Sequence, residues 1–122
     1  MQHNPGFLAA VEDAKSRVAE IDVPGVLALQ AAGAAFWLID VREDSEWNLG
    51  RMRGAVHLGR GILERDIETL VPDKSATLVL SCGGGYRSAL AADSLQRMGY
   101  SSVKSLAGGW RAWKDAGAPT EP

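Results

Sequence analysis

Apolar residues form two kinds of pattern that alternate along the chain. Continuous apolar runs of strand length, such as "AAFWLIDV" and "ATLVLSC", indicate strands that are buried on both faces of a sheet. We predict strands over residues 34–41, 54–58, 76–82 and 101–108. Between these runs, apolar residues recur at helical spacing, or start and stop signals of helices occur. We predict helices over residues 5–20, 24–32, 44–50, 61–72, 87–98 and 108–117.

The alternation of strands and helices, joined by short connections, is typical of a parallel sheet with helices on both of its faces. The length of 122 residues suits one compact domain. The sequence therefore predicts an α/β protein with a single core. The helix over residues 5–20 precedes the alternating unit, and it is either an appendage or a part of the packing.

The overall composition argues against several classes of partner. The net charge is −2 at pH 7 and no block of like charges occurs, so neither nucleic acid nor an anionic membrane is favoured. No apolar run approaches the length of a membrane span, and the N-terminal residues lack a secretory signal pattern. The single cysteine cannot form an internal disulfide, which is typical of a reducing compartment. We therefore expect a cytoplasmic protein.

The one cysteine, Cys82, stands where a predicted strand ends and three glycines begin. Sites in open parallel sheets form at the carboxyl ends of strands. A glycine loop that leads into a helix can direct several backbone N–H groups at an anion. Such surroundings favour the reactive thiolate, so Cys82 is a candidate nucleophile. The alternative is that Cys82 is a small buried apolar residue.

Other chemistries fit this loop less well. No Lys-Ser or Lys-Thr follows at the spacing of a phosphate-binding loop. Ser88 stands where a dinucleotide-binding fingerprint would have its third glycine. One cysteine and two histidines make no metal-ligand cluster, so we expect no metal site. His57 lies in an apolar stretch, where it is either a packed residue or a partner of the cysteine.

Four segments then resemble one known family in both content and order. "CGGGYRS", from Cys82 to Ser88, has the form Cys-x-x-x-x-Arg of an active-site loop, and "LIDVREDSEW", "GRMRGAVHL" and "LAGGWRAW" match further family segments. The chain resembles the single-domain rhodaneses, which are sulfurtransferases. The resemblance implies a rhodanese-like three-layer fold, with a central parallel sheet of about five strands and helices on both faces. It also implies a rhodanese-like domain over 21–117. The apolar spacing noted above makes residues 1–20 an N-terminal amphipathic helix, and residues 118–122 are left as a tail.

The resemblance implies a reaction as well. Cys82 takes a sulfane sulfur from thiosulfate or another persulfide donor, and it passes that sulfur from a Cys82 persulfide to cyanide or a thiol. No metal or organic cofactor is implied, and a protein that carries a persulfide is a possible partner. Two alternatives remain open: an interaction domain without activity, and a redox sensor that uses the thiol of a partner.

The length of the loop separates two chemistries within the wider superfamily. Four residues lie between Cys82 and Arg87, which is the sulfurtransferase length, whereas phosphatases of this fold have one more. Arg53 replaces a proline of the family pattern and is either an anion contact or a solvated residue. Gly84 stands where the two-domain thiosulfate-using members have a lysine, which weakens thiosulfate as the natural donor. Arg51 replaces the usual histidine.

The remaining candidates are assigned supporting roles. Arg87 is expected to orient the loop, to touch substrate or to pair with a carboxylate, and Ser88 to cap the helix or bond the loop. Asp40 and Arg42 are expected to be scaffold residues, with Arg42 pairing with Glu46. The predicted loop and substrate-binding residues are Gly83, Gly84, Gly85, Tyr86, Arg87, Ser88 and Arg53. Arg60 either lies at the rim of the pocket or is a solvated loop residue, and Trp110 and Trp113 are expected to be packing residues.

Overall fold

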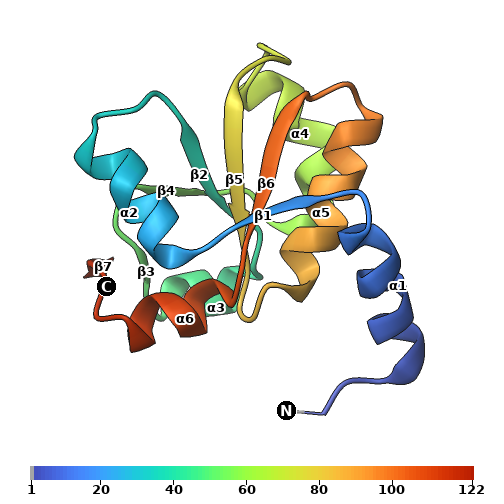
Figure 1. Ribbon diagram of the computed structural model, residues 1–122, viewed down its shortest axis with the longest axis horizontal. Coiled ribbons are helices and arrows are strands. Elements are labelled where there is room, and N and C mark those ends of the chain that lie inside the picture. Colours follow the sequence, from blue (N-terminus) through green and yellow to red (C-terminus); the bar gives the residue numbers. More distant parts are fainter. Residues whose placement is uncertain (1) are drawn as a thin grey trace.

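The computed structural model describes residues 2–122. A five-stranded sheet runs through its centre in the order β1-β6-β5-β2-β4, and each neighbouring pair of strands is parallel (Figure 1). The strands of this sheet are β1 Ala19–Ile21, β2 Trp37–Asp40, β4 Ala55–His57, β5 Thr77–Ser81 and β6 Ser102–Leu106. The predicted α/β class and the central parallel sheet are therefore confirmed.

Helices cover both faces of the sheet, which makes three layers (Figure 1). The helices are α1 Pro5–Lys15, α2 Val23–Ala31, α3 Asp44–Asn48, α4 Leu63–Leu70, α5 Tyr86–Arg97 and α6 Gly109–Asp115, and a 3-10 turn spans Arg60–Ile62. Alternation along the strands divides the core between the layers. Leu38 and Val79 pack with residues of α2 and α6, whereas Ile39, Leu78 and Leu80 pack with those of α4 and α5. The apolar runs on the central strands therefore contribute to two hydrophobic clusters, one on each face of the sheet, rather than to the single core expected from the sequence.

Three short strands lie outside the predictions. The helix expected over 5–20 ends at Lys15, and Ala19–Ile21 form β1, which pairs with β6 at the edge of the sheet. An expected boundary between residues 20 and 21 therefore falls inside a strand. In the expected tail, Thr120–Glu121 form β7, which pairs antiparallel with β3, Arg51–Met52. Because most of these residues are exposed, no apolar run marks them.

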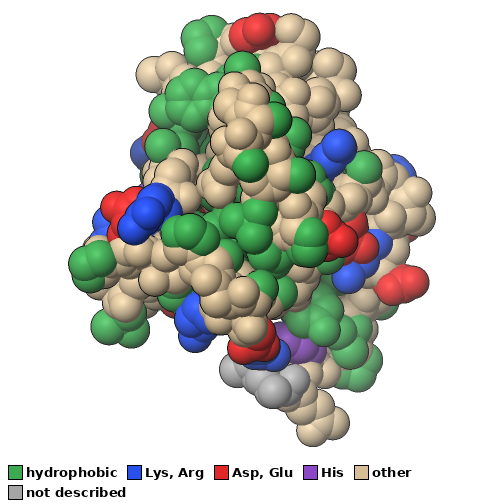
Figure 2. Space-filling view, turned by 60° about the vertical axis from the view of Figure 1, so that its left-hand side comes forward, with side chains coloured by type: hydrophobic (Ala, Val, Ile, Leu, Met, Phe, Trp, Pro, Cys, Tyr) green, Lys and Arg blue, Asp and Glu red, His purple; other side chains and the backbone are tan. Residues whose placement is uncertain are grey.

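The surface carries mixed charges. On the face drawn in Figure 2, Lys and Arg side chains are interspersed with Asp and Glu rather than gathered into a patch of one sign. Within residues 2–122 no helix has the length and apolar character that crossing a membrane requires.

The N-terminal helix α1 is docked on α5. Val11 and Ala14 of α1 are buried. Arg17, just beyond α1, donates from Nε and Nη2 to the two carboxylate oxygens of Asp93 on α5, over 3.0 and 2.8 Å. Gln96 Nε2 donates to the carbonyl oxygen of Arg17 over 3.0 Å. Apolar burial and a forked ion pair therefore hold α1 in one position.

We predict that Arg17→Ala loosens the docking of α1 without unfolding the protein. Loss of the bonds to Asp93 leaves the apolar contacts of α1 and the bond from Gln96 to the carbonyl oxygen of residue 17, so local opening becomes more frequent. Hydrogen exchange should then be several-fold faster for amides 6–15, with the central strands unchanged. Arg65→Ala is the matched control, because Arg65 pairs with its chain neighbour Asp66 and links no two elements. Equal exchange rates over 5–15 in all three proteins would contradict the prediction.

Candidate active site

The sulfur of Cys82 lies at the carboxyl end of β5, in the loop that leads into α5. Only 1% of the residue is exposed. The backbone N–H of Gly85 donates to Cys82 Sγ over 3.1 Å, and Ser88 Oγ lies 3.4 Å from the same sulfur. The loop therefore bends back on its own cysteine and directs one backbone N–H at the sulfur.

Gly85 permits this bend because its φ of +93° is a conformation that other residues rarely adopt. A Cβ at this position would also lie 3.0 Å from the backbone nitrogen of Gly108. Ser88 is held from the other side, since its hydroxyl lies 2.8 Å from Ser105 Oγ on β6. Both serines are fully buried. The sulfur of Cys82 thus contacts the hydroxyl of Ser88, which in turn is hydrogen-bonded to the hydroxyl of Ser105.

The first turn of α6 holds the outer side of the loop. The N–H groups of Trp110 and Arg111 donate to the carbonyl oxygens of Cys82 and Gly83, over 2.7 and 3.1 Å. Gly109 allows this approach, because a Cβ there would overlap the carbonyl oxygen of Cys82. Its φ of +53° also favours glycine. The two carbonyls therefore point toward α6.

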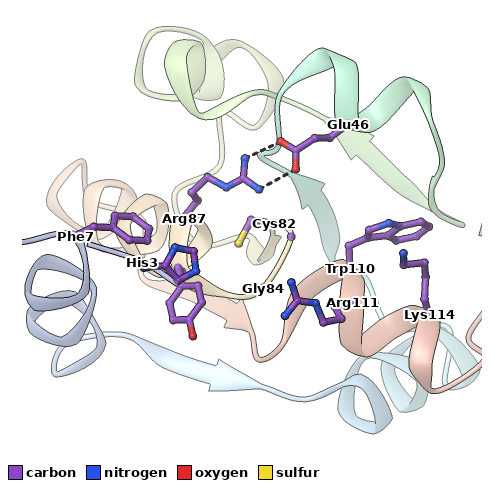
Figure 3. A pocket seen from close by; sticks show the side chains of 11 residues that line it. His3, Phe7, Glu46, Cys82, Gly84, Arg87, Trp110, Arg111 and Lys114 are labelled. Atoms are coloured by element: carbon purple, nitrogen blue, oxygen red, sulfur yellow. Dashed lines mark hydrogen bonds and ion pairs between the residues drawn. The ribbon is translucent and has the colours of Figure 1, made fainter. Parts of the chain in front are cut away.

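Arg87 does not point freely into the site. Its Nη1 and Nη2 donate to the two carboxylate oxygens of Glu46 on α3, over 2.7 and 2.9 Å (Figure 3). These hydrogen bonds hold the pKa of the Glu46 carboxyl below its ordinary value, and the same pairing raises the pKa of Arg87. Of the roles predicted for Arg87, the geometry matches pairing with a carboxylate.

The predicted partner of Arg42 is wrong. Arg42 pairs with Asp40, through Nη2 and Oδ2 at 2.8 Å, rather than with Glu46. Its backbone N–H also donates to Asp40 Oδ1 over 2.9 Å, which fixes the turn after β2. Nη2 donates further to the carbonyl oxygen of Gly50, and the guanidinium lies 4.9 Å from the centre of a Trp110 ring. The buried pair thus connects β2 to the loop before β3 and to α6.

A cavity of about 600 Å³ opens above Cys82. Among the residues predicted for the site, Cys82, Gly83, Gly84, Tyr86 and Arg87 line it. Gly85 and Ser88 contact the sulfur as described above. The full set of lining residues is His3, Phe7, Glu46, Cys82, Gly83, Gly84, Tyr86, Arg87, Trp110, Arg111 and Lys114.

Three candidates lie elsewhere. Arg53 is exposed at the end of β3 and does not line this cavity. His57 stacks on Trp47 with ring centres 4.8 Å apart, and its Nε2 lies 2.8 Å from the carbonyl oxygen of Arg42, so it is engaged away from the cysteine. Arg60 donates to Glu64 over 2.6 Å. No group of three His, Cys, Asp or Glu side chains within residues 2–122 is placed to hold a metal ion.

Sequence reasoning missed most of the cavity rim. His3 and Phe7 come from the N-terminal segment, and nothing near them in the sequence indicates a site. Figure 3 shows these two on one side of Cys82, with Trp110, Arg111 and Lys114 of α6 on the other. The spacing of the α6 residues offered a signal, since Lys114 stands four positions after Trp110 and three after Arg111, and residues at these spacings are neighbours on a helix surface.

Comparison with known proteins identifies the family. The Rhodanese-like domain family matches residues 24–116, so the chain belongs to this family. The thiosulfate sulfurtransferase PspE of Escherichia coli is 32% identical over 83 residues, which cover 68% of this chain and 79% of that protein. The putative sulfurtransferase YtwF of Bacillus subtilis is 36% identical over 88 residues, with 72% and 82% covered. These relatives support sulfurtransferase activity in general.

Solved structures agree on the fold. A protein of unknown function from Rhodopseudomonas palustris, described as a possible tyrosine phosphatase, superposes with a TM-score of 0.88 at 32% identity. The match covers 99% of this chain and 98% of that one, so it includes the N-terminal helix. The polysulfide-sulfur transferase of Wolinella succinogenes gives a TM-score of 0.81 at 27% identity, with 95% and 87% covered.

The pair of Glu46 and Arg87 should make stability depend on pH. The folded pKa of Glu46 lies below its ordinary value of 4.5, so the pair stabilises fully above that value. This contribution is lost as the pH falls through the folded pKa. Glu46→Gln should therefore lower the free energy of unfolding at pH 7, by at most about 1 kcal/mol for so open a pair.

Urea unfolding of the wild type and of Glu46→Gln, at pH 7 and again below pH 4, measures this difference. The gap between the two proteins should shrink at the lower pH. Glu12→Gln, at an exposed position on α1, is the control and should show no gap at either pH. A gap for Glu46→Gln that stays constant with pH would contradict the assignment.

The contact between α6 and the loop can be tested at Gly109. Gly33 has a similar φ of +65°, but a Cβ there would meet open space. Gly33→Ala should therefore cost only the backbone strain, about 1 kcal/mol. Gly109→Ala adds the overlap with Cys82 and should cost about 1–3 kcal/mol more. Urea unfolding measures both variants, and equal losses would contradict the close approach.

Proposed function

We propose that the protein is a sulfurtransferase that carries a sulfane sulfur as a persulfide on Cys82. The observation that carries this proposal is the N–H of Gly85 directed at Cys82 Sγ on the floor of the cavity. A donor of this kind stabilises negative charge on sulfur, both on the thiolate and on the terminal sulfur of a persulfide. The buried hydroxyl of Ser88 adds a second polar contact.

The reaction has two displacement steps. The Cys82 thiolate attacks the outer sulfur of thiosulfate or of another persulfide donor. The S–S bond of the donor breaks, and sulfite or a thiolate leaves with the bonding pair. Cyanide or an acceptor thiolate then attacks the outer sulfur of the persulfide and restores the Cys82 thiolate. This is nucleophilic catalysis through a covalent intermediate, with no net change in oxidation state of the protein.

Charge around the cavity suits an anionic donor. Gly84 leaves the loop without the lysine that the two-domain thiosulfate-using rhodaneses carry, and the charge of Arg87 is offset by Glu46. Arg111 and Lys114 instead bring two positive charges from α6 to the rim. Positive charge at a concave site raises the local concentration of anions. We expect thiosulfate, organic persulfides or a protein persulfide to serve as donors in a reducing compartment such as the cytoplasm.

Hydrolysis of phosphate esters is the second candidate, because the Rhodopseudomonas palustris protein is described as a possible tyrosine phosphatase. Two features favour sulfur transfer. Only four residues separate Cys82 from Arg87. In addition, both terminal nitrogens of Arg87 are engaged with Glu46, whereas a phosphate would need those donors for its oxygens.

The decisive experiment is intact mass spectrometry after incubation with thiosulfate. We expect one added sulfur atom, which cyanide removes as thiocyanate, because cyanide attacks the outer sulfur of the persulfide. Cys82→Ser is the matched control and should gain no sulfur. Hydrolysis of an aryl phosphate, measured on the same samples, tests the alternative. Phosphate release that depends on Cys82, with no sulfur gained from thiosulfate or polysulfide, would overturn the proposal.

A further inference from the structure

One side of the cavity is built from three rings. His3 and Phe7 of the N-terminal segment pack with Tyr86, the first residue of α5. The ring centres of His3 and Tyr86 lie 4.7 Å apart, those of His3 and Phe7 5.3 Å, and those of Phe7 and Tyr86 6.1 Å. All three residues line the cavity that contains Cys82. We call this set, His3, Phe7 and Tyr86, the aromatic wall.

The aromatic wall is fixed to the loop rather than laid loosely over it. Helix α1 is docked on α5 through Val11, Ala14 and the pair of Arg17 with Asp93. Helix α5 begins at Tyr86, so both parts of the wall are anchored to one element. Lys15 also places its Nζ 5.5 Å from the centre of the Tyr86 ring.

Two of the three residues of the aromatic wall lie outside the part of the chain that the family model matches. The family match begins at residue 24, whereas His3 and Phe7 precede it. The shared reaction therefore needs neither residue. A pair of side chains that lines the cavity of this chain, but is not part of the common domain, is suited to set the choice of substrate.

The opposite side of the cavity is cationic. Arg111 and Lys114 line it from α6 beside the ring of Trp110, and Lys114 Nζ lies 5.3 Å from a centre of that indole. Neither forms an ion pair within residues 2–122. A molecule above Cys82 thus meets aromatic rings on one side and positive charge on the other (Figure 3).

The size of the cavity also favours a donor larger than thiosulfate. A volume of about 600 Å³ is in the range of pockets for organic ligands, and thiosulfate would leave most of it empty. On the basis of the proposed function, we infer that the preferred donor is an organic sulfane-sulfur anion with a flat apolar group. That group packs on the aromatic wall, the anionic end faces Arg111 and Lys114, and Phe7 determines the preference.

Two thiosulfonates isolate this effect. Benzenethiosulfonate and methanethiosulfonate carry the same reacting group and charge, and they differ in the presence of an aromatic ring. In each case the Cys82 thiolate attacks the terminal sulfur, the bond between the two sulfurs breaks, and the sulfinate leaves with the bonding pair. The persulfide forms without an added oxidant, and cyanide discharges it as thiocyanate.

The measurement is kcat/KM for both donors in the wild type, Phe7→Ala and Leu8→Ala. We expect the preference for benzenethiosulfonate to fall about three- to tenfold in Phe7→Ala, because an aromatic contact is lost. The rate with methanethiosulfonate should fall less than the rate with benzenethiosulfonate, because methanethiosulfonate has no ring that could contact Phe7. Leu8 is an apolar neighbour on the same helix, 41% exposed and outside the cavity, so Leu8→Ala should keep the wild-type ratio. The intrinsic reactivities of the donors cancel when ratios are compared.

Each other outcome has a distinct meaning. An unchanged ratio in Phe7→Ala, or an equal loss with both donors, would overturn the role of Phe7 in selection. Hydrogen exchange over residues 5–15 verifies that α1 stays docked in each variant. If Phe7→Ala undocks α1, the same ratio is measured in Phe7→Leu, which keeps an apolar side chain but lacks the ring. Failure of both donors to load Cys82 in the wild type would instead overturn the proposed function.

Discussion

The site depends on the close approach of two backbone segments, the loop after β5 and the first turn of α6. The N–H groups at the start of α6 bond the carbonyl oxygens of Cys82 and Gly83, and Gly109 leaves room for them. A helix start has unpaired N–H groups that need acceptors, and a tight loop has carbonyls that need donors. The N–H groups at the start of α6 and the carbonyl groups of the loop thus satisfy each other's hydrogen-bonding requirements. With those carbonyls engaged by α6, the loop can direct the N–H of Gly85 at the sulfur.

Two ion pairs hold the residues around the contact between the loop and α6. In each pair the two charges offset each other, so neither pair adds a net charge near the sulfur. The pair of Asp40 and Arg42 is buried, and it connects the end of β2 to Gly50 and Trp110. A buried pair of this kind requires both partners, because removal of one leaves a charge without compensation. The pair of Glu46 and Arg87 lies at the surface of the cavity. The pair of Asp40 and Arg42 therefore supports α6, and the pair of Glu46 and Arg87 sets the polarity of the cavity wall.

The fold was predictable where burial leaves a pattern, and the site where its chemistry is local. Central strands such as Thr77–Ser81 are apolar runs, and Cys82 is marked by its own neighbours Gly83 to Arg87. Strand β1 was taken for the end of a helix because an exposed edge strand carries no such run. The partner of Glu46 was misassigned, since 41 residues separate it from Arg87 and only the fold brings them together. His3 and Phe7 were missed for the same reason.

Cys82 is the only cysteine of the chain, and its side chain is almost wholly enclosed. Under the proposed chemistry, a sulfur atom held there meets no second thiol of the same chain that could displace it. Discharge therefore waits for a molecule that enters the cavity from outside. Each chain then stores one sulfur atom, and the arrival of the acceptor determines when that atom is released. The rate of loading then follows the rate of discharge, because a Cys82 that still carries a sulfur cannot take another from the donor.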